Sequence, residues 1–414
     1  MKTRKIIMFA LCIVMSLSLF AAGDGTFALD TYEKNSAYLS QYFGIEIASD
    51  TVSLSDFAKD LSAVTGTEIV EPATEEGIIN IVVAASGFDE LAKTYSAEKA
   101  AARLEKYGVE NASDPQYAAA ALDSGVLSAE AVNGLVAAEG LSSEEAASLL
   151  MAVAYATGKG RNYIGFAGES DIQARIENVF KNVGLYSNDE LDAIGALLVE
   201  TGASTGYNLK RESDNARFLD SLTLRYGHDT KDHVKQLVAL LVSEDINALI
   251  QIEPKTSIYE YLLDWGPVPE PTPTYRVEQY SEDLYLVHAT EFDLELEFDT
   301  IEDLQKFDAV VNQYSKKNDA NQAEGSGVNL ILGAWWQPLY SARFNPDENA
   351  YTEIVDNVLY SADGAYSIHP FTTVENSASL IATEEELSEN GSTFADHRYV
   401  NNAFYRYLTG TDYQ

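Results

Sequence analysis

Cysteine is almost absent from this chain of 414 residues, since Cys12 is the only one. Cys12 lies in an apolar stretch, and the residue before it is Leu11, where a lipoprotein site needs a small residue. A single thiol cannot form an internal disulfide, and metal sites built from several thiolates are excluded with it. The folded chain must therefore be held together by packing.

Basic residues are also scarce: 27 Lys and Arg stand against 65 Asp and Glu, which gives a formal net charge of -38. Such a field repels nucleic acid and anionic membranes, so we expect neither as a partner. A solvated acidic surface is the simplest interpretation, and binding of cations or of a basic partner is the alternative. No Asp-x-Asp-x-Asp-Gly loop occurs, so no cofactor is predicted and calcium binding, left open, would be diffuse.

Long hydrophobic runs are missing apart from residues 6–20, which follow the basic residues Lys2, Arg4 and Lys5. This run is shorter than the roughly 20 residues that cross a bilayer, and Thr26-Phe27-Ala28 resembles a cleavage site. We therefore predict a signal peptide at residues 1–28 and a secreted or cell-surface protein, associated with the cell wall and without a membrane span.

Helical patterns fill the chain from about residue 31 to 215, and several begin with a serine followed three residues later by an acidic residue. Ser53 with Asp56 and Ser142 with Glu145 are two such pairs, each ahead of an apolar stripe at helical spacing. These patterns predict a helical region of similar units at 29–165 and a helical connecting region at 166–215.

Strand patterns enter after residue 216. Residues 221–226 and 246–252 read as strands on either side of a helix at 231–242, and residues 292–298 alternate apolar with acidic side chains. The alternation predicts one buried and one wet face. The fold class is predicted to be α+β, with a domain of the split β-α-β type at 216–414, crossed by the proline-rich segment 266–274.

Two stretches of the helical region resemble S-layer homology (SLH) domains, which hold cell-wall polysaccharide in Gram-positive exported proteins. The likeness lies in Tyr38-Leu39 and Gly44 ahead of residues 51–58, and in residues 117–121 and 123–126 ahead of residues 141–146. The resemblance implies an exported cell-envelope protein that binds cell-wall polysaccharide or another surface protein, and it covers residues 31–165 at most.

The capping pairs are the part of the family pattern that this chain retains. The family opens its helix with Thr-Arg-Ala-Glu after an apolar residue, but the arginine position is Leu54 in one unit and Ser143 in the other. The family arginine would hold the anionic polymer. The ligand-binding residues predicted here are the capping pairs: Ser53, Asp56, Ser142 and Glu145.

A Gly-x-Ser-x-Gly sequence at residues 202–206 matches the nucleophile elbow of serine hydrolases. That elbow needs a strand before the serine and a helix after it, whereas here a helical pattern comes first. We therefore predict a glycine loop that ends a helix.

His228, Asp229 and Asp232 gather where a predicted strand meets its helix, an edge at which open α/β sheets often bind ligands. They form a candidate metal site and support a second hypothesis, a secreted hydrolase or metal-dependent enzyme. The alternative is that Asp229 caps the helix.

Trp335 and Trp336 are neighbours in a predicted strand, so their side chains point to opposite faces. One of them could serve as a stacking platform for a sugar ring, which supports a third hypothesis, a carbohydrate-binding protein; the alternative is that both are buried. The leading hypothesis is a non-enzymatic envelope protein that binds through its SLH-like units.

Overall fold

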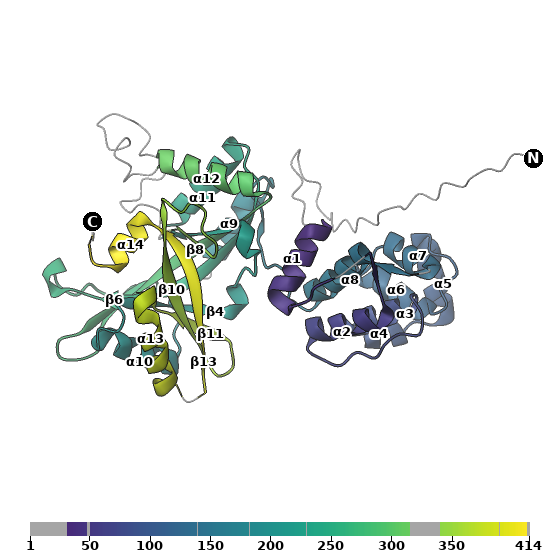
Figure 1. Cartoon of the computed structure of the whole chain (residues 1–414), viewed down its shortest axis with the longest axis horizontal. Coiled ribbons are helices and arrows are strands. Elements are labelled where there is room, and N and C mark those ends of the chain that lie inside the picture. Colours follow the sequence, from purple (N-terminus) through teal and green to yellow (C-terminus); the bar gives the residue numbers. More distant parts are fainter. Residues whose placement is uncertain are drawn as a thin grey trace, which may run out of the picture. The chain divides into compact units, whose positions relative to one another are not determined.

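Serine-capped helices begin the part of the chain that the computed structural model describes, which is residues 31–47, 50–138, 140–181, 183–228, 230–314, 340–388 and 390–411. The chain divides between Arg161 and Asn162 into two compact units, which are treated separately below. Helices make up nearly all of the first unit, and a large sheet dominates the second (Figure 1). The mixed α+β class predicted from the sequence is confirmed.

The first unit consists of short helices joined by tight turns. They are α1 (Tyr32–Phe43), α2 (Leu54–Thr65), α3 (Gly77–Ala85), α4 (Asp89–Lys93), α5 (Ala97–Tyr107), α6 (Pro115–Ser124), α7 (Ala129–Ala137) and α8 (Ser143–Ala156). Two-residue strands β1 (Thr51–Val52) and β2 (Leu141–Ser142) directly precede α2 and α8 and pair with each other antiparallel. This pairing joins the starts of two helices that are far apart in the sequence.

The beginnings and ends of these helices follow from their terminal residues. The Ser53 hydroxyl accepts a hydrogen bond from the backbone of Asp56, and Ser142 forms a full capping box with Glu145. At the other end, α1 stops at Gly44, whose φ of 64° is unfavourable for residues with a side chain. Tyr38 is fully buried, and its hydroxyl donates to the Lys159 carbonyl at 3.0 Å.

The second unit is built on strands of very different length. They are β3 (Gly165–Phe166), β4 (Gly206–Arg211), β5 (Thr223–His228), β6 (Ala248–Glu260), β7 (Tyr275–Gln279), β8 (Tyr285–Phe298), β9 (Tyr340–Ala342), β10 (Tyr351–Tyr360), β11 (Tyr366–His369), β12 (Phe371–Thr373) and β13 (Ser392–Asn401). Its helices are α9 (Ile172–Phe180), α10 (Asp189–Glu200), α11 (Lys231–Ser243), α12 (Ile301–Tyr314), α13 (Val374–Leu387) and α14 (Asn402–Leu408).

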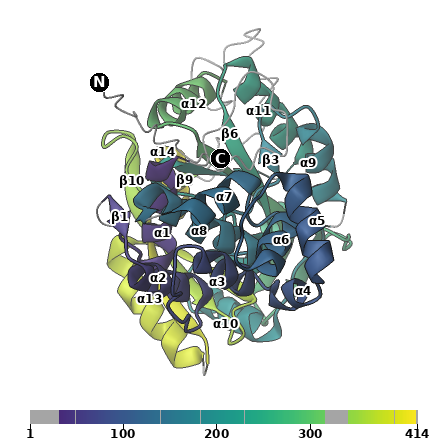
Figure 2. The same ribbon diagram turned by 90° about the vertical axis from the view of Figure 1, so that its right-hand side faces the viewer.

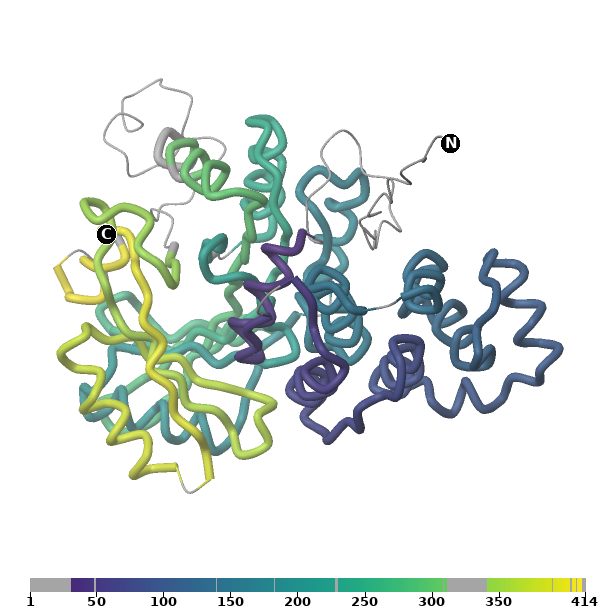
Figure 3. Tube along the Cα trace, turned by 45° about the vertical axis from the view of Figure 1, so that its right-hand side comes forward, coloured from purple at the N-terminus to yellow at the C-terminus, as the bar shows by residue number. Residues whose placement is uncertain are grey.

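Eight of these strands close into a barrel in which every neighbouring pair is antiparallel. The order is β6-β4-β11-β10-β13-β9-β5-β8, and the long pairing of β8 with β6 closes the ring. β3, β7 and β12 extend the sheet as additional partners of β6, β8 and β10. The tube view in Figure 3 follows the path of this chain. The described strands do not show the predicted split β-α-β arrangement, because they close into a barrel of antiparallel neighbours instead.

Helices cover the outside of the barrel and supply the apolar packing. Figure 2 places α11 and α12 at one end of the second unit and α10 and α13 at the other, as does Figure 1. Outward-facing Leu294 and Leu296 of β8 belong to the same core cluster as Leu237 of α11 and Phe307 of α12. A second cluster joins α10 to the outward face of β4. The outer faces of β4 and β8 are therefore apolar.

The second face of β8 is not wet, so that part of the prediction is wrong. Asp293, Glu295 and Glu297 alternate with the apolar residues as expected, but they are 4%, 4% and 0% exposed. The reason is the closure of the sheet, which turns the face opposite the helices into the interior of a barrel. Charged residues inside it must then find partners within the protein.

The predicted glycine loop at residues 202–206 is confirmed. Helix α10 comes before it, Gly202 has a φ of 73°, and β4 comes after it. The Ser204 hydroxyl donates to the Gly206 carbonyl at 2.6 Å. This helix–turn–strand order is the reverse of a nucleophile elbow. Among the described residues, no helix is both long enough and apolar enough to cross a bilayer.

Gly195 allows α10 to approach β4 closely, and we expect its replacement to destabilise the barrel. A methyl group at Gly195 would overlap the ring of Tyr207, which is held in place by a hydrogen bond to the Asp192 carbonyl. Gly195→Ala should lower the free energy of unfolding by about 1–3 kcal/mol, as overpacking does. Denaturant titration measures this change.

Gly168→Ala is the matched control, because a methyl group there would meet no atom within 4 Å. Its free energy of unfolding should stay within about 0.5 kcal/mol of the wild-type value. Equal stability of the two variants would show that the contact between α10 and β4 is not tight.

Candidate functional site

The interior of the barrel is charged, because strand alternation aims polar side chains inward. The inward residues are Lys210 from β4, Arg225 from β5, Glu253 and Lys255 from β6, Asp293 and Glu295 from β8, Asp356 from β10, His369 from β11, and Asp396 and Arg398 from β13. All except Arg225 are almost fully buried, and its side chain is only 15% exposed.

Asp293 binds both buried lysines of this network. Its carboxylate accepts hydrogen bonds from Lys210 Nζ at 2.5 Å and from Lys255 Nζ at 2.8 Å, and Lys210 also lies 3.3 Å from Glu253. Burial alone would raise the pKa of Asp293, but the charges of Lys210, Lys255 and Arg225 outweigh burial and hold the pKa well below its usual value. Both lysines are thus fully paired.

A second chain of hydrogen bonds runs along one wall of the barrel. The Ser367 hydroxyl donates to Glu212 at 2.5 Å, His369 Nε2 lies 2.9 Å from the Ser367 oxygen, and His369 Nδ1 lies 3.0 Å from Asp356. Burial would raise the pKa of Asp356, but the charge and hydrogen bond of His369 lower it to about 2. His369 thus links the Ser367 hydroxyl to the Asp356 carboxylate.

Ser367, His369 and Asp356 contact one another in the sequence of a Ser-His-Asp triad, but the Ser367 hydroxyl lacks the exposure that a nucleophile requires. Ser367 is 0% exposed, and its proton is directed to Glu212 instead of His369. In a working triad the serine oxygen faces the substrate and gives its proton to the histidine. The arrangement therefore holds the ring of His369 in place.

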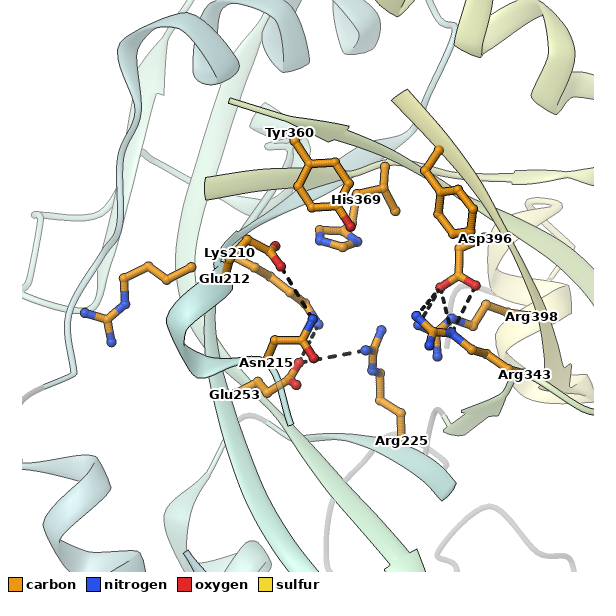
Figure 4. Close-up of a pocket in the computed structure, with 13 residues that line it drawn as sticks. Lys210, Glu212, Asn215, Arg225, Glu253, Arg343, Tyr360, His369, Asp396 and Arg398 are labelled. Atoms are coloured by element: carbon orange, nitrogen blue, oxygen red, sulfur yellow. Dashed lines mark hydrogen bonds and ion pairs between the residues drawn. The ribbon is translucent and has the colours of Figure 1, made fainter. Parts of the chain in front are cut away.

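A cavity opens at the end of the barrel above these networks (Figure 4). Its lining consists of Lys210, Arg211, Glu212, Asn215, Arg225, Glu253, Arg343, Val358, Tyr360, His369, Phe394, Asp396 and Arg398. Figure 4 shows Arg225 reaching toward the centre, with Asp396, Arg343 and Arg398 on one side and Lys210 on the other. Phe394 at the rim is 54% exposed.

Two arginines share one carboxylate at the cavity wall. Asp396 accepts from Arg343 Nε at 3.1 Å and lies 2.6 Å from Arg398 Nη2, and Arg343 also contacts Asp220 at 2.7 Å. Within the described part of the chain, Asp396 is the only ion-pair partner of Arg398, and the buried Nε of Arg398 donates to no acceptor there. Burial lowers the pKa of Arg398, and the neighbouring charges of Arg225 and Arg343 lower it further.

The four capping residues predicted as ligand contacts lie around the β1–β2 pair in the first unit. Thr51 pairs with Ser142 in the strand register, so the two capped helix starts are brought side by side. The Ser53 and Ser142 hydroxyls both donate to the carboxylates of their own capping partners, Asp56 and Glu145, at 2.6 and 2.7 Å. These side chains serve the local caps.

The residues of the predicted metal site are only partly described. His228 ends β5 and pairs with Phe292, Asp232 is an exposed residue in the first turn of α11, and Asp229 falls in a gap between described ranges. The helix cap is Thr230, not Asp229, since its side chain accepts from the backbone of His233. Within the described ranges, no group of three His, Cys, Asp or Glu residues could hold a metal ion. Trp335 and Trp336 lie outside the part of the chain that the structure describes.

The sequence analysis missed the cavity residues for identifiable reasons. Lys210 lies in a stretch predicted to be helical, and Arg343, His369 and Arg398 follow no motif. The alternation at residues 292–298 was the available signal, because acidic residues repeated on one face of a strand need cationic partners if that face is covered. Comparison of the chain with models of protein families, with curated proteins and with solved structures finds no match.

Replacing Asp293 tests the interior network. Asp293→Asn leaves Lys210 and Lys255 buried without their shared carboxylate, so we expect a loss of about 3–5 kcal/mol in the free energy of unfolding at pH 7. Because the pKa of Asp293 is depressed in the folded state, its contribution is present above the unfolded pKa of about 3.8 and is lost as pH falls through the folded pKa.

The difference between wild type and Asp293→Asn should therefore be constant from about pH 5 to 7 and shrink only below about pH 4. Asp264→Asn is the control, since Asp264 is exposed on the loop after β6, and it should change stability by less than about 0.5 kcal/mol. A difference that does not depend on pH would show that Asp293 is not held ionised by the lysines.

Proposed function

We propose that this chain is an exported, non-enzymatic protein of the cell envelope whose second unit binds a small ligand in the mouth of the barrel. The observation that carries the proposal is the cavity in which charged side chains from several strands converge beside the exposed residue Phe394. Ligand sites typically combine apolar walls with a few converging polar groups.

Stability alone is a weak reason for a charged barrel interior. Ion pairs removed from water recover little more than their desolvation penalty, and well-packed apolar residues are often as stable or more so. The network around Asp293 and Arg225 nevertheless fixes the rotamers of the residues beneath the cavity. A rigid, polar floor is the arrangement that a pre-formed binding site requires.

The barrel proposal is tested with a broad panel of sugars, amino acids, carboxylic acids, phosphates and neutral aromatic compounds, using the shift in thermal unfolding. At least one compound class should raise the melting temperature of the wild type. Phe394→Ser should weaken that binding because Phe394 is the exposed ring at the rim. Val70, another exposed apolar residue, lies in the first unit, so Val70→Ser should have no effect on binding. If no compound of the panel raises the melting temperature, the proposal is wrong.

A second function is binding of cell-wall polysaccharide by the first unit, as the SLH-like stretches imply. The pairing of β1 with β2 favours it, because the two stretches that carry the resemblance lie next to each other instead of at opposite ends of the unit. A polymer could then contact both capped helix starts at once. Secretion and attachment to the wall belong to this proposal, together with the alternative of a protein partner at the surface.

Co-sedimentation of the full chain with purified cell-wall polysaccharide tests the second function. Wild-type protein should sediment with the polymer, and the double variant Asp56→Ala, Glu145→Ala should bind at least about ten-fold less tightly if both helix starts make contact. Asp171→Ala, an exposed acidic residue of the second unit, is the control and should bind like wild type. Recovery no better than that of an unrelated acidic protein would exclude wall binding.

A further inference from the structure

We infer that the ligand of the barrel mouth is a small organic oxyanion, held through its carboxylate or phosphate group by Arg398. This inference rests on the proposed function and narrows it to one chemical class. It is drawn from the charges that line the cavity, from the incomplete pairing of Arg398, and from the aromatic side chains beside it.

The cavity lining has more positive than negative side chains. Of the residues that line it, five are Lys or Arg and three are Asp or Glu. The rest of the protein is strongly acidic, with a net charge of -38. A cationic lining in such a chain is a local feature that the overall composition does not explain.

The positive groups at the base of the cavity are neutralised by the protein itself. Lys210 is bound to Asp293 and Glu253, and the guanidinium group of Arg225 has Glu295 as its nearest carboxylate and Glu253, Asp293 and Asp356 within 4.0 Å. No ligand is needed to compensate these contacts. Nearer the opening, Arg343 is paired with both Asp220 and Asp396, whereas Arg398 has to share Asp396 with it.

Arg398 is the residue with unused hydrogen-bonding capacity. Its side chain is 7% exposed, it contacts Asp396 through Nη2, and its Nε has no hydrogen-bond partner within the described part of the chain. A buried donor without an acceptor destabilises the folded state, and more so when it is charged. Burial and the neighbouring charges of Arg225 and Arg343 lower the pKa of Arg398, and Asp396, which opposes this shift, is shared with Arg343.

A carboxylate or phosphate group matches these donors, because a guanidinium group presents parallel N–H groups to two oxygens of an oxyanion. Tyr360, Phe394 and Val358 line the same cavity and provide apolar contact for the body of the ligand. The fit is therefore to an anionic group carried on a ring or a short carbon skeleton. Neutral sugars would leave the buried donor of Arg398 without a charged acceptor.

Two matched series of probes test the inference by isothermal titration calorimetry on the full chain. The first is glucose, glucosamine, glucuronate and glucose 6-phosphate, and the second is benzyl alcohol, benzylamine, benzoate and phenyl phosphate. Within each series the ring is the same and the charge differs. The anionic members of at least one series should bind at least about ten-fold more tightly than its neutral and cationic members. Comparing glucuronate with glucose 6-phosphate, and benzoate with phenyl phosphate, shows whether the site prefers a carboxylate or a phosphate group.

Arg398→Met removes the guanidinium group with little change in length, and it should weaken anion binding at least about ten-fold. Arg398→Lys keeps the charge but loses the paired N–H groups, and it should bind anions with intermediate affinity. Arg103→Met is the matched control, because Arg103 forms a comparable arginine–aspartate pair with Asp123 in the first unit. Its anion affinity should equal that of wild type. Thermal unfolding of each variant without ligand establishes that the barrel is folded, and Arg398→Lys serves alone if Arg398→Met does not fold.

Neutral or cationic probes that bind as tightly as the anions, or anion affinity unchanged in a folded Arg398 variant, would overturn this inference and leave the proposed function standing. Absence of binding by any compound of either series, while the broad panel yields another ligand, would do the same. Absence of any ligand from the broad panel would overturn both.

Discussion

Pairing of β8 with β6 is the contact on which the second unit depends. It runs from Ala248 opposite Phe298 to Glu260 opposite Leu286, and it turns an open sheet into a closed ring. Closure removes the sheet edges and divides every strand into an outward and an inward face. The helices can cover only the outward face, so the charged inward face has no solvent and no helix to meet. It has to be neutralised across the barrel.

That requirement fixes the strand register as well as the charges. Moving β8 by one residue against β6 would send Asp293 and Glu295 outward into the apolar layer and bring Leu294 inside. This shift would also break the contacts of Asp293 with Lys210 of β4 and Lys255 of β6. Buried ion pairs of this kind add little net stability, but they penalise wrong pairings strongly. The charged interior thus specifies the fold and also provides the floor of the cavity.

Local patterns in the sequence predicted the elements that depend on local chemistry. The serine caps at Ser53 and Ser142, the helix at 231–242 and the glycine loop after α10 all follow from residues within a few positions of each other. The alternation at 292–298 gave the strand and the correct set of outward residues. It could not give the environment of the other face, because a wet face and a barrel interior have the same alternating pattern.

The candidate site could not be predicted because its members are distant in the sequence. Lys210 and Ser367 face each other only through the pairing of β4 with β11, and Arg225 reaches Asp356 only through closure of the ring. No spacing rule connects such residues. His369 shows the same limit: its neighbour Ser367 is two positions away, but Asp356, which binds His369, and Glu212, which binds Ser367, come from two other strands or their ends.

The acidity of the whole chain and the cationic cavity have to be considered together. At physiological ionic strength the field of surface charges decays over about 8 Å, so an anion approaching the protein is repelled at a distance and attracted only at the barrel mouth. Long-range steering cannot then speed its association. Affinity must come from short contacts with Arg398 and its neighbours, which are buried and only weakly screened by salt. A site of this kind favours a ligand that presents its charge in the geometry of the guanidinium groups over one that is merely negative.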